Sequence, residues 1–229
     1  MIFITLFFKV LFMMEKAQKH LDDLSEIRQI MERSTRFLSL SGLSGVFAGL
    51  FALAGTLAAW LYMHTNGLYY DENFRMIRGE AMLSPRMFLL LDASVVLVMA
   101  LASTLFFSYR KARRQSLPFW SPVLKRLLFH LLVPLLTGGI LSVILIWQNH
   151  LNLVAPLTLV FYGLALVSAG KFTNREIMVL GAAEILAGLA AAVWQAYGLW
   201  FWGAGFGLFH ILYGVALYLK YDRKPVRHA

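Results

Sequence analysis

Apolar positions form long runs in this chain, and polar positions are confined to short intervals between them. No Asp, Glu, Lys or Arg occurs from residue 127 to residue 170, and only one, Glu184, occurs from residue 177 to residue 219. Each run is about twice the length of roughly 20 residues that a helix needs to cross the hydrocarbon core. Each is also interrupted near its middle, at 148–152 and at 196–198. The pattern therefore predicts two membrane-spanning helical hairpins.

Two further apolar segments precede these hairpins, which gives six predicted spans. In lipid, every backbone polar group must be satisfied within the segment, so such runs form helices. The predicted fold class is therefore all-α, a polytopic bundle of six transmembrane helices over residues 38–220, followed by a basic cytoplasmic tail at 221–229. The predicted spans cover residues 38–62, 87–108, 127–148, 153–170, 177–196 and 199–219.

The residues before the first predicted span divide into two parts. Residues 1–13 are apolar but too short to cross a bilayer, and they lack a small-residue cleavage site, which disfavours a signal peptide. We interpret them as the product of an upstream start codon, with translation beginning at Met13 or Met14, or alternatively as an interfacial segment. Residues 14–37 are charged and carry an apolar stripe, which predicts a cytoplasmic amphipathic helix on the membrane surface. A short coiled-coil dimerisation segment is the alternative.

Composition and charge support a membrane location and predict its orientation. Charged residues make up 14% of the 229, against roughly 25% in soluble domains. Of the 21 basic residues, 18 lie before span one, after span six or in the second and fourth connections, and the other three are Arg75, Arg78 and Arg86. Because cytoplasmic loops are enriched in Lys and Arg, both termini are predicted to be cytoplasmic. Five of the six tryptophans lie at the opposite, outer ends of spans, the headgroup level that indole rings prefer.

The second connection carries a basic cluster with no acidic residue, and it predicts contact with anionic lipid headgroups, with docking of a partner protein as the alternative. Across the chain, basic residues flank apolar runs rather than gather on one soluble face, which argues against a nucleic-acid partner. The expected partners are membrane lipids, together with a second copy of the chain or another membrane protein. The residues of the basic cluster are Arg110, Lys111, Arg113, Arg114, Lys125 and Arg126.

Three spans carry small residues at steps of three and four, which place them on one helix face. Such faces let helix backbones approach closely in lipid. We therefore expect spans one, five and six to pack tightly against one another through these faces. The residues are Gly42, Gly45 and Gly49 on span one, Gly181 and Gly188 on span five, and Gly203, Gly207 and Gly214 on span six.

Two ionisable residues share those small-residue faces. Glu184 and His210 lie in spans five and six, and both are roughly 12–14 Å from the cytoplasmic ends of their helices. The turn between these spans is short, so the helices are antiparallel neighbours and the two side chains can meet. A charge at this depth costs roughly 3 kcal/mol or more. The pair is interpreted either as a structural interhelical contact or as a proton-sensitive or substrate-contacting site.

Asp92 is a third ionisable residue within a predicted span. It lies about six residues, or roughly 9 Å, from the outer end of span two. Arg86 or Arg78 is the expected partner, reaching inward along its flexible side chain. The alternative is that span two begins later, which would leave Asp92 near the interface.

The sequence contains no complete catalytic constellation. The segment Gly42-Leu43-Ser44-Gly45 resembles the G-x-S-G motif of rhomboid intramembrane serine proteases, which also carry a histidine on a sixth helix. In that family the serine opens the fourth helix, whereas Ser44 lies on the first, and the H-x-x-x-N oxyanion motif is missing. Tight helix packing explains the match instead. Cysteine is absent and the six histidines are scattered, so we expect no catalytic residue, no metal and no cofactor.

Residues 32–49, ERSTRFLSLSGLSGVFAG, resemble the start of an uncharacterised family of bacterial polytopic integral membrane proteins. The resemblance implies a cytoplasmic helix leading into span one, a bacterial inner-membrane location and no established activity. The leading interpretation is a non-enzymatic scaffold, sensor or accessory subunit. The first alternative is a small transporter or proton-coupled carrier that uses Glu184 and His210. The second is an intramembrane hydrolase.

Overall fold

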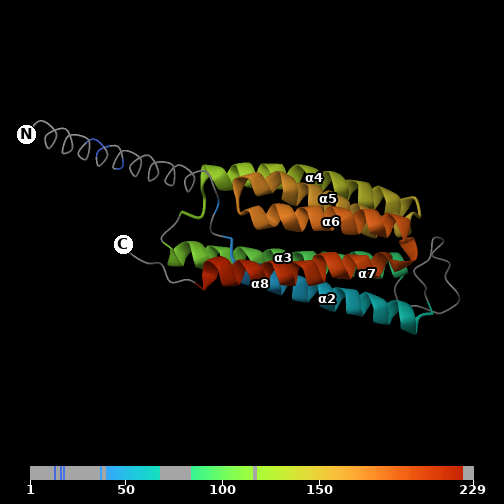
Figure 1. The fold of residues 1–229 in the computed structure, drawn as a ribbon. Helices are drawn as coiled ribbons and strands as arrows, with labels where there is room; N and C mark the ends of the chain where they lie inside the picture. The colour runs from blue at the N-terminus through green and yellow to red at the C-terminus, as the bar shows by residue number, and fades with distance from the viewer. Residues whose placement is uncertain are drawn as a thin grey trace, which may run out of the picture. The chain divides into compact units, whose positions relative to one another are not determined.

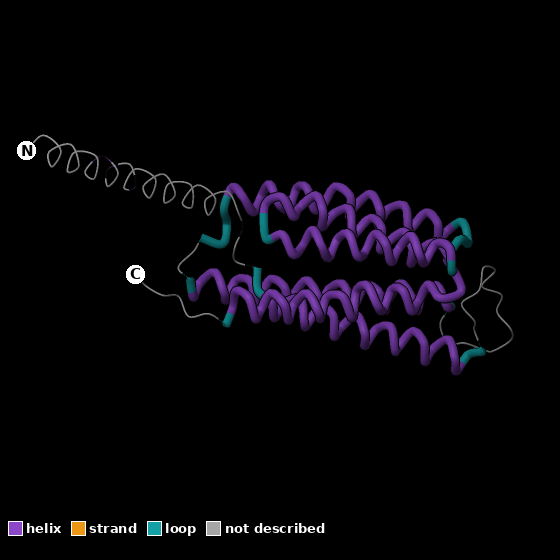
Figure 2. The backbone as a smooth tube through the Cα atoms, in the orientation of Figure 1, coloured by secondary structure: helices purple, strands orange, loops and turns teal. Residues whose placement is uncertain are grey.

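The computed structural model describes Met13, Lys16, Gln18 and Phe37, and then residues 40–67, 84–115 and 118–223. Over these residues the chain forms helices and no strand (Figure 2). Six helical segments are long and apolar enough to cross a membrane, which confirms the predicted all-α fold of a multi-pass membrane protein. They are Gly42–Thr65, Pro85–Arg114, Pro122–Trp147, Leu151–Phe172, Arg175–Val193 and Gln195–Asp222.

The second and third spans are single helices whose starts are set by a serine followed by a proline. They are α3 (Pro85–Arg114) and α4 (Pro122–Trp147). The hydroxyls of Ser84 and Ser121 each accept a hydrogen bond from the backbone N–H three residues on. Proline is well placed directly after such a cap, because the N–H that it lacks has no intrahelical partner at that position. Both helices therefore begin earlier than the apolar runs alone predicted.

The first and fifth spans are the single helices α2 (Gly42–Thr65) and α6 (Arg175–Val193). The fourth span and the sixth, which we call the last span, are assembled from shorter pieces. The helix of the last span runs past the predicted residue 219 and takes in the first two residues of the expected basic tail. The pieces are η1 (Leu151–Leu153), α5 (Val154–Ala169) and η2 (Gly170–Phe172) in the fourth span, and η3 (Gln195–Tyr197), α7 (Gly198–Trp202), η4 (Gly203–Phe209), α8 (His210–Leu217) and η5 (Tyr218–Asp222) in the last span.

The six spans form two layers of three (Figure 1). In one layer α5 packs against both α4 and α6, and in the other α2 packs against both α3 and the last span. The last span also packs against α5 and α6, so it joins the two layers. α3 and α4 pack mainly on α2 and α5 respectively, which makes them the edge helices of their layers.

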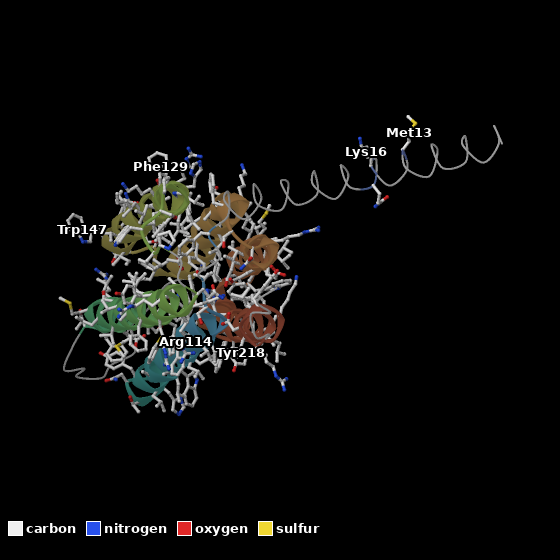
Figure 3. The ribbon with its side chains drawn as sticks, turned by 90° about the vertical axis from the view of Figure 1, so that its left-hand side faces the viewer. Met13, Lys16, Arg114, Phe129, Trp147 and Tyr218 are labelled. Carbon is white, nitrogen blue, oxygen red and sulfur yellow. The ribbon has the colours of Figure 1, made fainter. Side chains whose placement is uncertain are left out.

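Small residues fill the inside of this bundle, and large apolar residues cover its outside. The buried positions of α2 are mainly glycine, alanine, serine and threonine. On α4, Phe129 and Trp147 are 66% and 82% exposed and point away from the other helices (Figure 3). Soluble monomers rarely expose contiguous apolar surface on this scale. The arrangement is that of a protein whose outer surface faces lipid.

The glycine faces of α2 and the last span meet as expected, backbone against backbone. A Cβ placed on Gly42 would lie 2.3 Å from the backbone nitrogen of Tyr218, and one placed on Gly214 would lie 2.5 Å from that of Val46. No side chain fits between helices this close. Gly45 and Gly49 make similar backbone contacts, at 3.0 Å to Gly214 Cα and 2.5 Å to the Gly207 carbonyl oxygen. Gly203 and Gly207 instead leave room for the side chains of Thr56 and Leu53, whose nearest atoms lie 2.8 and 2.4 Å from a Cβ placed on them.

The glycines of α6 pack differently from the prediction. Gly181 and Gly188 face α5, where a Cβ placed on them would lie 2.7 Å from the Gly163 carbonyl oxygen and 2.7 Å from Val160 Cγ2. Gly163 provides the matching gap on α5, since its own Cβ would lie 2.5 Å from the Gly181 carbonyl oxygen. The expectation that spans one, five and six all meet through their small-residue faces is thus correct for spans one and six, and wrong for span five. Gly163, in the middle of span four and outside any predicted stripe, supplies the partner.

Residues 1–36 form a compact unit separate from residues 37–229. In the first unit the structure describes Met13, Lys16 and Gln18, and all three are helical and exposed. The predictions for residues 1–13 and 14–37, including the choice of start codon and the amphipathic helix, otherwise lie outside the described residues. The tail from residue 224 onward does too.

Candidate functional site

Glu184 lies inside the bundle on α6 and has no exposed surface. Its carboxyl group rests against the last span at Gly205, where a Cβ would lie 2.4 Å from Glu184 Oε2 and 2.5 Å from Leu159 Cδ2. A glycine is therefore needed opposite the acid, because any side chain there would occupy the space of the carboxyl group. Leu159 of α5, also fully buried, closes the third side.

His210 reaches the same place from the start of α8 and is 7% exposed. Its Nδ1 lies 3.4 Å from Glu184 Oε1 and 3.1 Å from the carbonyl oxygen of Gly205. Because a carbonyl oxygen can only accept a hydrogen bond, Nδ1 carries a hydrogen and donates a hydrogen bond to the Gly205 carbonyl oxygen. The structure thus places the two residues of the predicted intramembrane pair beside each other.

The second ring nitrogen of His210 is held by a residue that the sequence did not single out. Tyr162 of α5 has its hydroxyl 2.7 Å from His210 Nε2. With a neutral imidazole the tyrosine donates to Nε2, and with an imidazolium Nε2 donates to the tyrosine. Phe206 covers this hydrogen bond, with ring centroids 5.0 Å from Tyr162 and 6.1 Å from His210. A tyrosine in the middle of an apolar span is the signal that could have identified it, because a buried hydroxyl needs a partner.

A π-helix positions the backbone of this site. The segment η4 (Gly203–Phe209) contains three buried glycines and ends directly before His210. π-helical turns are uncommon and occur frequently at functional sites. Here the widened turn presents the Gly205 carbonyl to the His210 ring while keeping the helix surface flat enough for Glu184.

The surroundings of Glu184 are poor in hydrogen bonds. Within the described part of the chain, neither of its carboxyl oxygens has a hydrogen-bond partner. His210 is the one ionisable group within ion-pair distance of it there. Burying an ionised carboxylate without hydrogen bonds is costly unless a cation compensates it. Among the described residues, Glu184 therefore depends on His210 for any charge compensation.

Asp92 lies on α3 and is only partly buried. It faces α2 at Gly55, where a Cβ would lie 3.2 Å from Asp92 Oδ2. The predicted partner Arg86 does not pair with it; its guanidinium donates instead to the side-chain oxygen of Asn149, at the tip between α4 and η1. Arg86 lies in the first turn of α3, close to the loop that carries Asn149, whereas Asp92 lies six residues further along the helix. The guanidinium therefore reaches the loop more easily than it reaches Asp92. Arg78, the other expected partner, lies outside the described residues.

Asp92 and Arg86 both line a cavity of about 120 Å³, which we call the α3 cavity. It lies where the two layers approach each other at the end of the bundle opposite the basic cluster. α3 provides the largest share of its walls, and α2, α4, α5 and α7 provide the rest. The lining residues are Thr56, Ala59, Arg86, Leu89, Leu90, Asp92, Ala93, Ile146, Leu151, Val154, Ala155, Leu199 and Trp202.

The basic cluster is split by the structure. Arg110, Lys111, Arg113 and Arg114 belong to the last turn of α3 rather than to a loop, and Lys125 and Arg126 belong to the first turns of α4. Five of the six are exposed and free to contact headgroups, whereas Lys111 is turned inward. Its Nζ lies 2.7 Å from Asp222 Oδ1 and donates to the Leu40 carbonyl oxygen at 2.7 Å. Lys111 is therefore engaged within the protein, not available for lipid.

Asp222 completes this inner cluster, and the sequence analysis did not identify it. Its Oδ2 accepts hydrogen bonds from the backbone N–H of Gly42 at 2.8 Å and from the hydroxyl of Ser41 at 3.2 Å. One carboxylate thus caps the start of α2 and pairs with α3 from the end of the last span. Asp222 is the one acidic residue among the basic residues that follow the predicted span six, and this could have identified it from the sequence.

The geometry does not support the resemblance to rhomboid proteases. The Ser44 hydroxyl donates to the Ser41 carbonyl oxygen at 2.6 Å, and both ring nitrogens of His210 are engaged with other groups. Ser44 and His210 therefore form no dyad. Among the described residues, no group of three or more His, Asp or Glu side chains is arranged to hold a metal ion.

Fold and site together define a multi-pass helical membrane protein with a buried acid–imidazole–phenol cluster. Comparisons with models of protein families, with curated proteins and with solved structures find no match to this chain.

Proposed function

We propose that this chain is a non-enzymatic protein of the bacterial inner membrane that serves as a scaffold, sensor or accessory subunit. The observation that supports this most directly is the complete burial of Glu184. Carriers place their substrate and coupling ion at a site near the midplane that is opened to each side in turn. In this structure the matching position is filled by Leu159, Gly205 and His210.

The surface of the bundle supports the same proposal. The exposed basic residues at the ends of α3 and α4 form a face that suits anionic headgroups or an acidic partner. The described connections at both ends are short, so they offer no room for a soluble catalytic domain. A membrane lipid and either a second copy or another membrane protein are the partners that we propose.

Thiol labelling tests the closed interior directly, because the native chain contains no cysteine. Leu159→Cys places a thiol beside Glu184, and Lys171→Cys places one at an exposed position of η2. In membranes permeabilised so that both faces are accessible, we expect a charged methanethiosulfonate to modify Lys171→Cys and to leave Leu159→Cys unmodified. Modification of Leu159→Cys at a comparable rate would reveal a water-filled pathway and contradict the proposal.

The second candidate is a proton-coupled carrier that uses Glu184 and His210. It is favoured by one observation: beside a π-helix, Glu184 has no hydrogen-bond partner in the described part of the chain. Proteoliposomes loaded with a pH-sensitive dye distinguish the candidates. Proton flux that requires the reconstituted chain and is lost in Glu184→Gln would establish the carrier, and no flux above that of empty liposomes is expected for a scaffold.

We further propose that both termini lie in the cytoplasm, on the strength of the asymmetry of basic residues along the chain. His150→Cys and Lys171→Cys put exposed thiols at the two ends of the fourth span. In intact spheroplasts an impermeant maleimide should label His150→Cys, and Lys171→Cys should react only after the membrane is permeabilised. The reverse pattern would place the termini outside.

A further inference from the structure

We propose that the α3 cavity binds a small organic ammonium group, with Asp92 as its counter-ion and Arg86 at the rim for an anionic group of the same ligand. This site is separate from the Glu184–His210–Tyr162 cluster and does not depend on the proposed function. The ligand class is a small primary ammonium, either as a free amine or as the head of a zwitterion.

The first argument is that Asp92 has no cationic partner among the described residues. Asp92 stands seven residues past the start of α3, roughly 10 Å along the helix axis. Within the described part of the chain, no Lys, Arg or His nitrogen lies within 4.0 Å of it. An acid in a membrane-spanning helix is costly, and such residues face cavities and pair with other groups. A ligand cation would supply the missing partner.

The second argument is that Arg86 is held away from Asp92. Its hydrogen bond to Asn149 fixes the guanidinium at the rim of the cavity. Asn149 is the one non-glycine residue with a positive φ, 68°, among those described, so the loop adopts an uncommon conformation where it meets Arg86. The guanidinium has five N–H donors, and only one is used by Asn149. The others remain to bind a phosphate or carboxylate.

The third argument is the chemistry of the walls. Trp202 lines the cavity together with Asp92 and presents an aromatic ring. Indole is the best of the aromatic rings at attracting an ammonium ion, and a site that combines it with a carboxylate is suited to organic cations. Thr56 also lines the wall; its hydroxyl donates to the Ala52 carbonyl, which leaves its oxygen free to accept from an N–H group.

The size of the cavity limits the ligand to a small ammonium-bearing group. A volume of about 120 Å³ corresponds to roughly four waters at about 30 Å³ each, or to a similar number of non-hydrogen atoms. An aminoethyl group has this size, whereas a sugar or nucleotide does not. The rest of the wall is apolar, and Leu90 is partly exposed to the lipid-facing side of α3. Both the ethanolamine head of a phospholipid and a free short amine share the required chemistry.

Binding is tested on the full chain in detergent with ethanolamine, and in nanodiscs with phosphatidylethanolamine or phosphatidylglycerol. We expect ethanolamine or phosphatidylethanolamine to raise the unfolding temperature and to be retained in native mass spectrometry, and the neutral analogue ethylene glycol and phosphatidylglycerol to have no such effect. Stabilisation by ethanolamine alone identifies a free amine as the ligand. Stabilisation that requires the phospholipid identifies the headgroup. If neither acts more strongly than its control, the proposal is overturned.

Variants separate the two charged groups. Asp92→Asn keeps the side-chain shape and should weaken binding of the ammonium probe about tenfold or more, the loss expected for one hydrogen bond to a charged group. Arg86→Gln should weaken the binding of phosphatidylethanolamine but not the binding of ethanolamine. Glu176→Gln, which removes a carboxylate at the other end of the bundle, is the matched control and should bind like the native chain. Equal binding by Asp92→Asn and the native chain would overturn the assignment.

Discussion

At the scale of single residues, the site is defined by an imidazole that lies between a carboxyl group and a phenol. Glu184, His210 and Tyr162 come from three helices, and each nitrogen of the imidazole faces one of the other two. The pair that the sequence predicted is therefore part of a larger cluster. Its third member matters because a hydroxyl on Nε2 supports both the neutral and the charged imidazole.

The hydrogen bond to His210 gives a prediction about two buried tyrosines. Tyr162→Phe removes the partner of Nε2 and should destabilise the fold by about 1–3 kcal/mol, the cost of leaving a buried polar group unsatisfied. Tyr213→Phe is the matched control, because the Tyr213 hydroxyl is buried without a hydrogen-bond partner among the described residues. Its removal should be neutral or stabilising. Unfolding in mixed micelles measures both, and equal losses would show that the Tyr162–His210 bond contributes nothing.

At the scale of elements, glycine decides which helices pair. α2 meets the last span through Gly42 and Gly214, and α5 meets α6 through Gly163 and Gly181. Between these two close pairs lies the contact of α6 with the π-helix, where Gly205 accommodates Glu184. Close helix approach thus has a consequence for the site, because it brings the carboxyl group to the imidazole.

Replacement of single glycines tests this packing. Gly214→Ala would put its Cβ 2.5 Å from the backbone nitrogen of Val46, which cannot move without shifting α2. Overpacking of this kind costs about 1–3 kcal/mol, and rigid backbone contacts fall at the upper end. Gly139→Ala is the control, because no atom lies within 4 Å of a Cβ there. It should raise stability by up to about 1 kcal/mol through helix propensity. Thermal unfolding in detergent measures both, and a tolerated Gly214→Ala would refute the close contact.

At the scale of the whole molecule, one ion pair closes a layer at the end where the last span finishes. Asp222 joins the end of the last span to the start of α2 and to Lys111 of α3, and both charged side chains are 11% exposed. A second pair, Lys220–Glu176, joins the last span to α6, but its lysine is 59% exposed. Because the Lys111–Asp222 pair is the more deeply buried, we expect it to contribute more to the stability of the bundle than the Lys220–Glu176 pair.

Removal of each lysine measures that difference. Lys111→Met leaves Asp222 without its cation and should destabilise the bundle by about 3 kcal/mol. Lys220→Met breaks an exposed pair and should leave the unfolding transition unchanged within error. The free energy of unfolding of both variants in the same lipid–detergent mixture is the measurement. A loss of the same size in Lys220→Met would mean that the inner cluster has no special role.

Much of the architecture is determined by the sequence alone. The absence of charge from residue 127 to residue 170 predicts lipid-spanning helices, because an apolar segment of about 20 residues satisfies its own backbone in lipid as a helix. The same reasoning placed all six spans to within a few residues. The depth and facing of Glu184 and His210 follow from helical geometry and a short connecting turn, which is why their contact could be predicted.

Tertiary structure decided which residues complete each site. Four findings depend on contacts between helices that are distant in sequence. They are the packing of the α6 glycines against α5, the hydrogen bond between Tyr162 and His210, the inward orientation of Lys111, and the absence of an Asp92–Arg86 pair. Local pattern fixes the face and depth of a side chain on its own helix. Which side chain lies opposite it depends on how the helices rotate and slide against one another. That arrangement results from packing energies summed over all the helices, so no single segment determines it.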